Sequence, residues 1–180
     1  MNFDIIRLSN ISNVLKYSNL LNEINNLSPY YLPSFISGFS DEISSLICFY
    51  ARTKDNGLIL MPGHILEIPD ISGYYDFVSP YGYSGPIYTS GIKEYDLIYF
   101  WEEIENWHKL NNIVSEFIRF SLNSNYVGYN GNLLLTLWNI KGVILSSEEE
   151  QWKNFERKVR KNIKRAQNEN LICNIFEGSN

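Results

Sequence analysis

The chain has 180 residues, of which 44% are apolar and 15% aromatic. This length fits one domain with a proper core or one half of a larger protein, and the composition excludes a chain that is disordered throughout. The formal net charge of −5 argues against a general nucleic-acid or anionic-membrane binder, although it leaves room for a local basic patch.

The N-terminus and the cysteines favour a cytoplasmic protein. Met1–Asn10 lacks the basic start and the apolar core of a signal peptide. No stretch approaches the roughly 20 apolar residues that a membrane-spanning helix needs. Cys48 and Cys173 both lie in apolar runs, so we expect two reduced core thiols.

The first hundred residues alternate between strand and helix patterns. Residues 3–8 are β-prone and predict an opening strand, and Ser12 can cap a following helix. The apolar runs at 46–52 and 58–61 flank an Asn–Gly turn, which predicts a β-hairpin. A further short strand is predicted at 64–68.

The second half begins with an amphipathic helix. Its apolar residues recur at steps of three and four from Leu97 to Trp107, and the helix is predicted to end near Asn111. Strands are predicted at 113–120 and then at 133–138 and 143–145, around a Lys–Gly turn.

One long helix is predicted to close the chain. Ser147 and Glu150 form a capping box, and apolar positions continue at helical spacing to Ala166. Together these elements predict an α/β (α+β) fold in which helices flank a mixed, largely antiparallel central sheet.

The stretch Ser79–Pro86 (SPYGYSGP) is the most informative loop. Gly82 and Gly85 can take positive φ, while the flanking prolines restrict the chain. Such a loop can aim backbone amides and the hydroxyls of Tyr81 and Tyr83 at a ligand. The alternative is a rigid connection whose tyrosines cover the sheet edge.

A basic helix face lies near the end of the chain. Between Gln151 and Asn170 the charged residues are seven cations and two anions, with Arg160 and Lys164 on one face. One interpretation is a solvated helix face whose late cations complement the helix dipole. Alternatively it forms an anion site for a phosphate, a carboxylate or an RNA backbone.

Two charges, Glu116 and Arg119, fall in the apolar strand predicted at 113–120. They fall on opposite faces of that strand, and because a buried charge needs a partner, we expect structural ion pairing there rather than a catalytic role. His64 and His108 are isolated in the sequence, and no residues have metal-ligand spacing. A nucleophile elbow and a pyrophosphate-binding loop for coenzyme A are also missing from the sequence, and we name no catalytic base.

Three segments, in this order, resemble a known family. They are SPYGYSGP at 79–86, SEFIRFSLN at 115–123, and the helix at 152–171 with the core VRKNIKRA. Together they resemble the N-terminal region of Fem-type proteins, a branch of the GNAT-fold acyltransferases that includes enzymes building peptidoglycan cross-bridges. Ser84 stands where many relatives have glycine, and 121–123 is shorter than the usual segment.

The resemblance implies that residues 1–180 form a single GNAT-like domain, the acceptor-binding half of an acyltransferase. The second half, which would carry much of the acyl-donor site, would be supplied in trans or outside this sequence. The donor would be acetyl-CoA or an aminoacyl-tRNA, and the acceptor an amine or a sugar in bacterial cell-wall or surface-glycan synthesis. No metal is expected, and no nucleic acid other than tRNA.

Residue roles follow from the same resemblance. The acceptor would be oriented by the loop and an anionic group held by the cations. The substrate-binding residues expected are Tyr81, Gly82, Tyr83, Ser84, Gly85, Arg119, Arg160 and Lys164. Two rival functions stay open: a non-catalytic module that binds a glycan or nucleotide-sugar by aromatic stacking, and RNA contact through the basic helix.

Overall fold

The structure is a computed structural model that describes residues 1–25, 27–39, 45–136, 138–139 and 142–174. Contacts divide the chain into two compact units, which we call unit 1 (Met1–Leu135) and unit 2 (Thr136–Asn180). A single GNAT-like domain over the whole chain stays a prediction.

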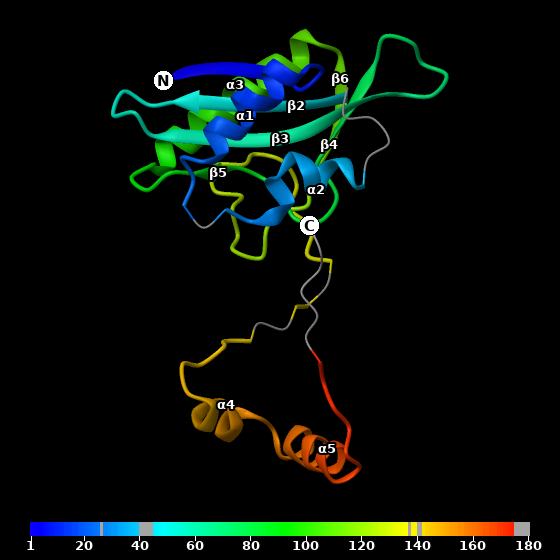
Figure 1. Ribbon diagram of the computed structural model, residues 1–180. Coiled ribbons are helices and arrows are strands. Elements are labelled where there is room, and N and C mark those ends of the chain that lie inside the picture. The colour runs from blue at the N-terminus through cyan, green and yellow to red at the C-terminus, as the bar shows by residue number, and fades with distance from the viewer. Residues whose placement is uncertain (26, 40–44, 137, 140–141, 175–180) are drawn as a thin grey trace. The chain divides into compact units, whose positions relative to one another are not determined.

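Unit 1 is built on a six-stranded sheet with the order β1-β2-β3-β4-β6, and β5 also pairs with β3 (Figure 1). Every pairing is antiparallel except that of β4 with β6, which is parallel. This arrangement confirms the predicted α+β fold class. The strands are β1 (Asn2–Arg7), β2 (Leu46–Arg52), β3 (Leu58–Glu67), β4 (Tyr75–Val78), β5 (Ile87–Tyr88) and β6 (Ile113–Phe117).

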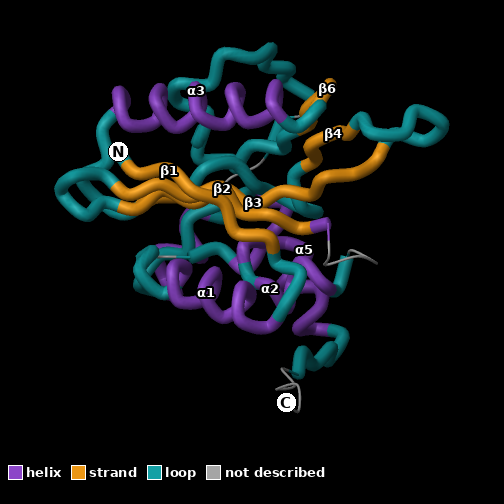
Figure 2. The backbone as a smooth tube through the Cα atoms, turned by 90° about the horizontal axis from the view of Figure 1, so that it is seen from above, coloured by secondary structure: helices purple, strands orange, loops and turns teal. Residues whose placement is uncertain are grey.

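Helices cover both faces of this sheet, α1 and α2 on one and α3 on the other (Figure 2). The helical elements of unit 1 are α1 (Ile11–Leu21), a 3₁₀ turn at Pro29–Tyr31, α2 (Pro33–Ser37) and α3 (Glu94–Leu110). The central strands β2 and β3 are therefore apolar on both sides. Cys48 and Leu60 pack in the cluster under α1, and Phe49 and Met61 pack in the cluster under α3.

The hairpin of β2 and β3 is confirmed, and β3 continues beyond its predicted end. It runs through Pro62 and Gly63 into the segment predicted as a separate strand. Proline has no N–H for a ladder hydrogen bond, so it is tolerated where a strand side lacks a partner. Here β5 pairs with β3 only at Ile59–Leu60 and β4 only from His64 onward, which leaves Pro62 between the two.

The helix α3 begins and ends close to the predicted positions. Asp96 accepts a hydrogen bond from the Lys93 N–H (3.1 Å), which closes its first turn. The strand after it, β6, stops at Phe117 and not at Phe120 as predicted. Its partner β4 ends at Val78 and leads into the loop, so the residues beyond Phe117 have no strand to pair with.

The strands predicted at 133–138 and 143–145 are wrong for every residue of theirs that the structure describes. Positions 133–136, 138 and 143–145 have no strand structure, and Leu134 is almost wholly exposed. A β-prone pattern makes a strand only where a neighbouring strand completes its hydrogen bonds. Among the described residues, no strand pairs with these segments.

The single long helix predicted for unit 2 is two helices, α4 (Glu148–Asn154) and α5 (Arg157–Asn168). Ser147 caps α4 as expected, since its hydroxyl accepts from the Glu150 N–H (3.4 Å). Phe155 and Glu156 then take extended backbone angles (ψ 138° and 152°) and break the helix. The expected apolar stripe is split between two axes and is not buried.

The two cysteines differ. Cys48 is buried as expected, but Cys173 is exposed in unit 2, where none of the described side chains is buried. Among the helices of the described residues, none has both the length and the apolar character to cross a bilayer.

Candidate ligand-binding site

Backbone hydrogen bonds hold the loop 79–86 in place. The Ser79 N–H donates to the Phe117 carbonyl (2.9 Å), and the Ser84 N–H donates to the Arg119 carbonyl (2.7 Å). In return the Arg119 N–H donates to the Ser79 hydroxyl (3.1 Å). These two loop amides therefore bind the strand end and do not face a ligand, contrary to the expectation that the loop presents its amides.

Both predicted glycine positions have the backbone that only glycine adopts easily. Gly82 has φ 92° and Gly85 has φ 94°. A Cβ on Gly82 would lie 2.3 Å from the Tyr30 ring. The Gly85 carbonyl accepts a hydrogen bond from the buried Tyr31 hydroxyl (3.1 Å). The loop is thus pressed against the segment that carries α2.

Asn125 completes the loop, although no sequence pattern pointed to this residue. Its side-chain N–H₂ donates to the carbonyls of Ser84 (2.9 Å) and Pro86 (3.0 Å), and its oxygen accepts from the Ser121 N–H (2.8 Å). Ser84 is only 1% exposed, and no group in the described part of the chain bonds its hydroxyl. Ser84 is therefore packed inside the loop and cannot touch a ligand directly.

The loop presents an aromatic surface to solvent. Tyr81 stacks on Phe39 with ring centroids 4.4 Å apart and ring planes 15° apart. The two side chains remain 62% and 56% exposed, so each keeps its outer ring face open. Behind them Phe35 contacts Phe39 (4.9 Å).

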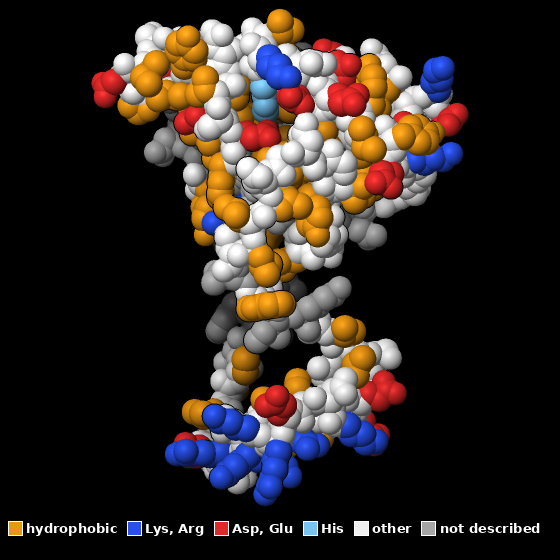
Figure 3. Space-filling model, turned by 180° about the vertical axis from the view of Figure 1, so that it is seen from behind, with side chains coloured by type: hydrophobic (Ala, Val, Ile, Leu, Met, Phe, Trp, Pro, Cys, Tyr) orange, Lys and Arg blue, Asp and Glu red, His pale blue; other side chains and the backbone are white. Residues whose placement is uncertain are grey.

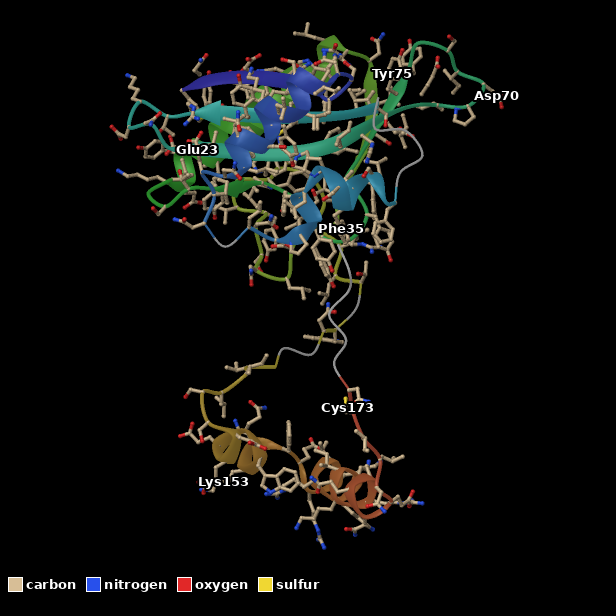
Figure 4. All side chains as sticks on the ribbon, viewed as in Figure 1. Glu23, Phe35, Asp70, Tyr75, Lys153 and Cys173 are labelled. Atoms are coloured by element: carbon tan, nitrogen blue, oxygen red, sulfur yellow. The ribbon has the colours of Figure 1, made fainter. Side chains whose placement is uncertain are left out.

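The same ring-to-ring contacts continue inward. Phe35 meets Tyr30 edge-on (5.1 Å), and Tyr30 meets Tyr83 (5.6 Å). We call these five rings the aromatic platform: Tyr30, Phe35, Phe39, Tyr81 and Tyr83. Figure 4 shows Phe35 on the α2 side of the sheet. The chemistry that the platform offers is flat, apolar contact with a planar or sugar ring.

His64 lies on the sheet face that carries the platform. Side chains alternate along β3, so His64 shares its face with Leu58 and Leu60, which pack with Tyr31. Its Nδ1 lies 2.9 Å from the Ser45 hydroxyl, which orients the ring. Burial lowers the pKa of His64, so the imidazole is neutral at pH 7 and able to accept a proton. His64 also pairs across the strands with Val78, the residue before the loop.

Glu116 and Arg119 differ in how they are partnered. The Glu116 carboxyl accepts from the Tyr129 hydroxyl (2.8 Å) and lies 3.7 Å from His108 Nδ1. Burial raises the pKa of Glu116, and it lowers the pKa of His108 to about 4. Arg119 is exposed and forms no ion pair with any described residue. Arg119 lies beyond the end of β6 at Phe117, so the two residues do not share a strand.

The remaining predicted residues lie in the other unit. Arg160 and Lys164 lie on α5 in unit 2, while the loop lies in unit 1. A hollow of about 370 Å³ lies at the β3–β4 turn, lined by residues 67–70 and Ser72, and it includes no loop residue. Among the described residues no three His, Cys, Asp or Glu side chains gather as metal ligands would.

Comparison of the chain with family models, with curated proteins and with solved structures finds no match. The Fem-type resemblance therefore rests on the three sequence segments alone.

Proposed function

We propose that unit 1 binds a sugar-bearing acceptor on the aromatic platform, as the acceptor-binding part of a GNAT/Fem-type acyltransferase. The observation that carries the proposal is the exposed, parallel stack of Tyr81 on Phe39. Soluble proteins normally bury such rings, and an exposed pair marks a binding surface. Sugar rings present flat C–H faces that pack on aromatic rings.

Rigidity supports the same proposal. Tyr81 lies in a loop fixed by Gly82, Gly85 and Asn125. Phe39 lies two residues after the end of α2, and its N–H donates to the Ile36 carbonyl (3.1 Å). Rings held in place lose little conformational entropy when a ligand stacks on them. The loop therefore acts as a support for the platform.

Acyl transfer to an amine or hydroxyl also needs a group that accepts a proton. We assign this role to His64, because its imidazole is neutral, oriented by Ser45 and placed on the platform face. The acyl donor is acetyl-CoA or an aminoacyl-tRNA, as the resemblance implies.

Calorimetric titration with UDP-N-acetylglucosamine and with N-acetylglucosamine oligomers tests acceptor binding. Tyr81→Ala and Phe39→Ala are each expected to weaken binding by about 10-fold, or about 1.4 kcal/mol, because one stacking face is lost. Tyr95→Ala is the matched control, since Tyr95 is equally exposed (62%) but lies on α3. The absence of binding by the unmutated chain, or equal losses in all three variants, contradicts the proposal.

A non-catalytic glycan-binding module is the second candidate. It is favoured because the aromatic platform can hold a sugar ring by stacking alone, without any catalytic side chain. Incubation with labelled acetyl-CoA and the ligand that binds separates the two functions. Turnover that falls in His64→Gln while calorimetric affinity is kept supports the acyltransferase. Binding without turnover supports the module.

A further inference from the structure

The described residues of unit 2 form no core of their own. None of their side chains is buried, and Trp138, Ile144 and Ile172 are 91%, 94% and 83% exposed. Folded proteins seldom leave so many large apolar side chains in water. The apolar surface of unit 2 therefore calls for an occupant.

The helix α5 carries a strong positive charge. Its twelve residues include six cations and no acidic residue. At 100° per residue the cations fall within an arc of about 160°, and Val159, Ile163 and Ala166 lie on the opposite side. Figure 3 shows Lys and Arg side chains gathered on the surface of unit 2.

Helix stability does not account for this charge. Arg157 and Lys158 lie in the first turn, where the positive end of the helix dipole disfavours cations. Of the six cations only Arg165 has an ion pair within the described residues, with Glu169 at 3.0 Å. A solvated face that complements the dipole explains the cations of the last turn and not those of the first.

We infer that unit 2 binds the surface of a membrane that contains anionic lipid. Lipid phosphates neutralise the cations of α5, and the acyl region receives apolar side chains such as Trp138, Ile144 and Ile172. An RNA backbone would pair with the cations and leave the apolar side chains in water. One occupant thus accounts for both unpartnered features, independently of the function proposed for unit 1.

Sedimentation of the full chain with lipid vesicles tests the inference. Vesicles of phosphatidylcholine with 30% phosphatidylglycerol are compared with vesicles of phosphatidylcholine alone. Partitioning to the anionic vesicles is expected to be at least 10-fold stronger, and to fall steeply in 0.5 M NaCl because salt screens surface charge.

Two variants and a control assign the contact to its residues. The triple change Arg157→Gln, Lys158→Gln and Lys161→Gln is expected to weaken binding about 100-fold, at about fivefold for each cation. The double change Ile144→Ser and Ile172→Ser is expected to weaken it about 10-fold or more. The control triple changes Lys54, Lys93 and Lys109 of unit 1 to Gln, which removes the same charge from exposed sites and leaves binding unchanged.

Three results overturn the inference. The first is no partitioning to anionic vesicles, and the second is partitioning that neither salt nor the α5 triple reduces. The third is that the chain does not bind vesicles but binds a 20-nucleotide RNA or polyglutamate, and that the triple change in α5 abolishes this binding. That result would assign the basic face to a nucleic acid or an acidic protein.

Discussion

Single polar atoms show how the loop 79–86 is stabilised. The Ser79 hydroxyl accepts a hydrogen bond from the Arg119 N–H, whereas the Ser84 hydroxyl is buried and has no described partner. The two serines lie in one loop and differ mainly in this respect. A buried hydroxyl without a partner destabilises the fold, and a bonded one stabilises it.

Alanine at these two serines is therefore expected to have opposite effects. Ser84→Ala raises the free energy of unfolding by about 0.5–1 kcal/mol, and Ser79→Ala lowers it by about 1 kcal/mol. Urea unfolding of both variants measures the difference. A loss of stability in Ser84→Ala as large as that in Ser79→Ala would show that the Ser84 hydroxyl has a partner.

His108 makes stability depend on pH. The imidazole gains a proton below about pH 6.5 when the chain is unfolded, but burial in the folded chain lowers its pKa to about 4. The unfolded state binds more protons between these values, so stability falls as pH falls. The raised pKa of Glu116 acts in the opposite direction, because the folded chain then takes up the carboxyl proton first.

Replacing His108 isolates its contribution. Between pH 6.5 and 5 the unmutated chain is expected to lose about 2 kcal/mol through this residue. His108→Gln removes that part of the loss, while His64, whose pKa is also lowered, keeps its own. Urea unfolding at both pH values gives the comparison. An unchanged pH dependence in His108→Gln would mean that His108 ionises alike in both states.

At the scale of elements, the loop and the segment with α2 fit each other through Gly82. Gly82 and Gly91 both have a positive φ. A Cβ on Gly91 would meet no atom within 4 Å, whereas a Cβ on Gly82 would meet the Tyr30 ring. Alanine at Gly91 therefore introduces backbone strain alone, and alanine at Gly82 introduces the same strain together with a steric clash. Strain at positive φ alone costs about 1 kcal/mol for alanine.

Alanine at both positions tests this fit. Gly91→Ala is expected to lower the free energy of unfolding by about 1 kcal/mol, and Gly82→Ala by about 2–4 kcal/mol, because the Tyr30 ring must move as well. Thermal unfolding ranks the two. Equal losses would mean that the loop and Tyr30 are not in firm contact.

For the whole molecule, the two units differ in how much they bury. Unit 1 has two apolar clusters on the two faces of its sheet, whereas the described residues of unit 2 include no buried side chain. Local opening is cheap where little apolar surface is buried. The chain should therefore open first in unit 2.

Limited proteolysis with trypsin, without lipid, is expected to cut at Lys and Arg of α4 and α5 before it cuts at Lys109 of α3. Mass spectrometry of the early fragments identifies the order. Simultaneous cutting in both units would show that unit 2 is as well protected as unit 1.

Local patterns by themselves determined the α+β class, the β2–β3 hairpin, the extent of α3 and the cap of α4. In each, the information lies within a few residues: an Asn–Gly turn, a helical apolar spacing, a capping serine. The glycines and tyrosines of the loop 79–86 also indicated a candidate binding loop, without any knowledge of its tertiary contacts.

Only the tertiary structure decided what that loop faces. Tertiary contacts place Phe39 against Tyr81 and Tyr30 against Tyr83, and they place Glu116 beside Tyr129 and His108. It also left the segments predicted at 133–138 and 143–145 without strand structure wherever it describes them, since a strand depends on a neighbour that is distant in sequence. Such contacts are non-local, and the spacing of residues along the chain does not encode which distant partner will be met.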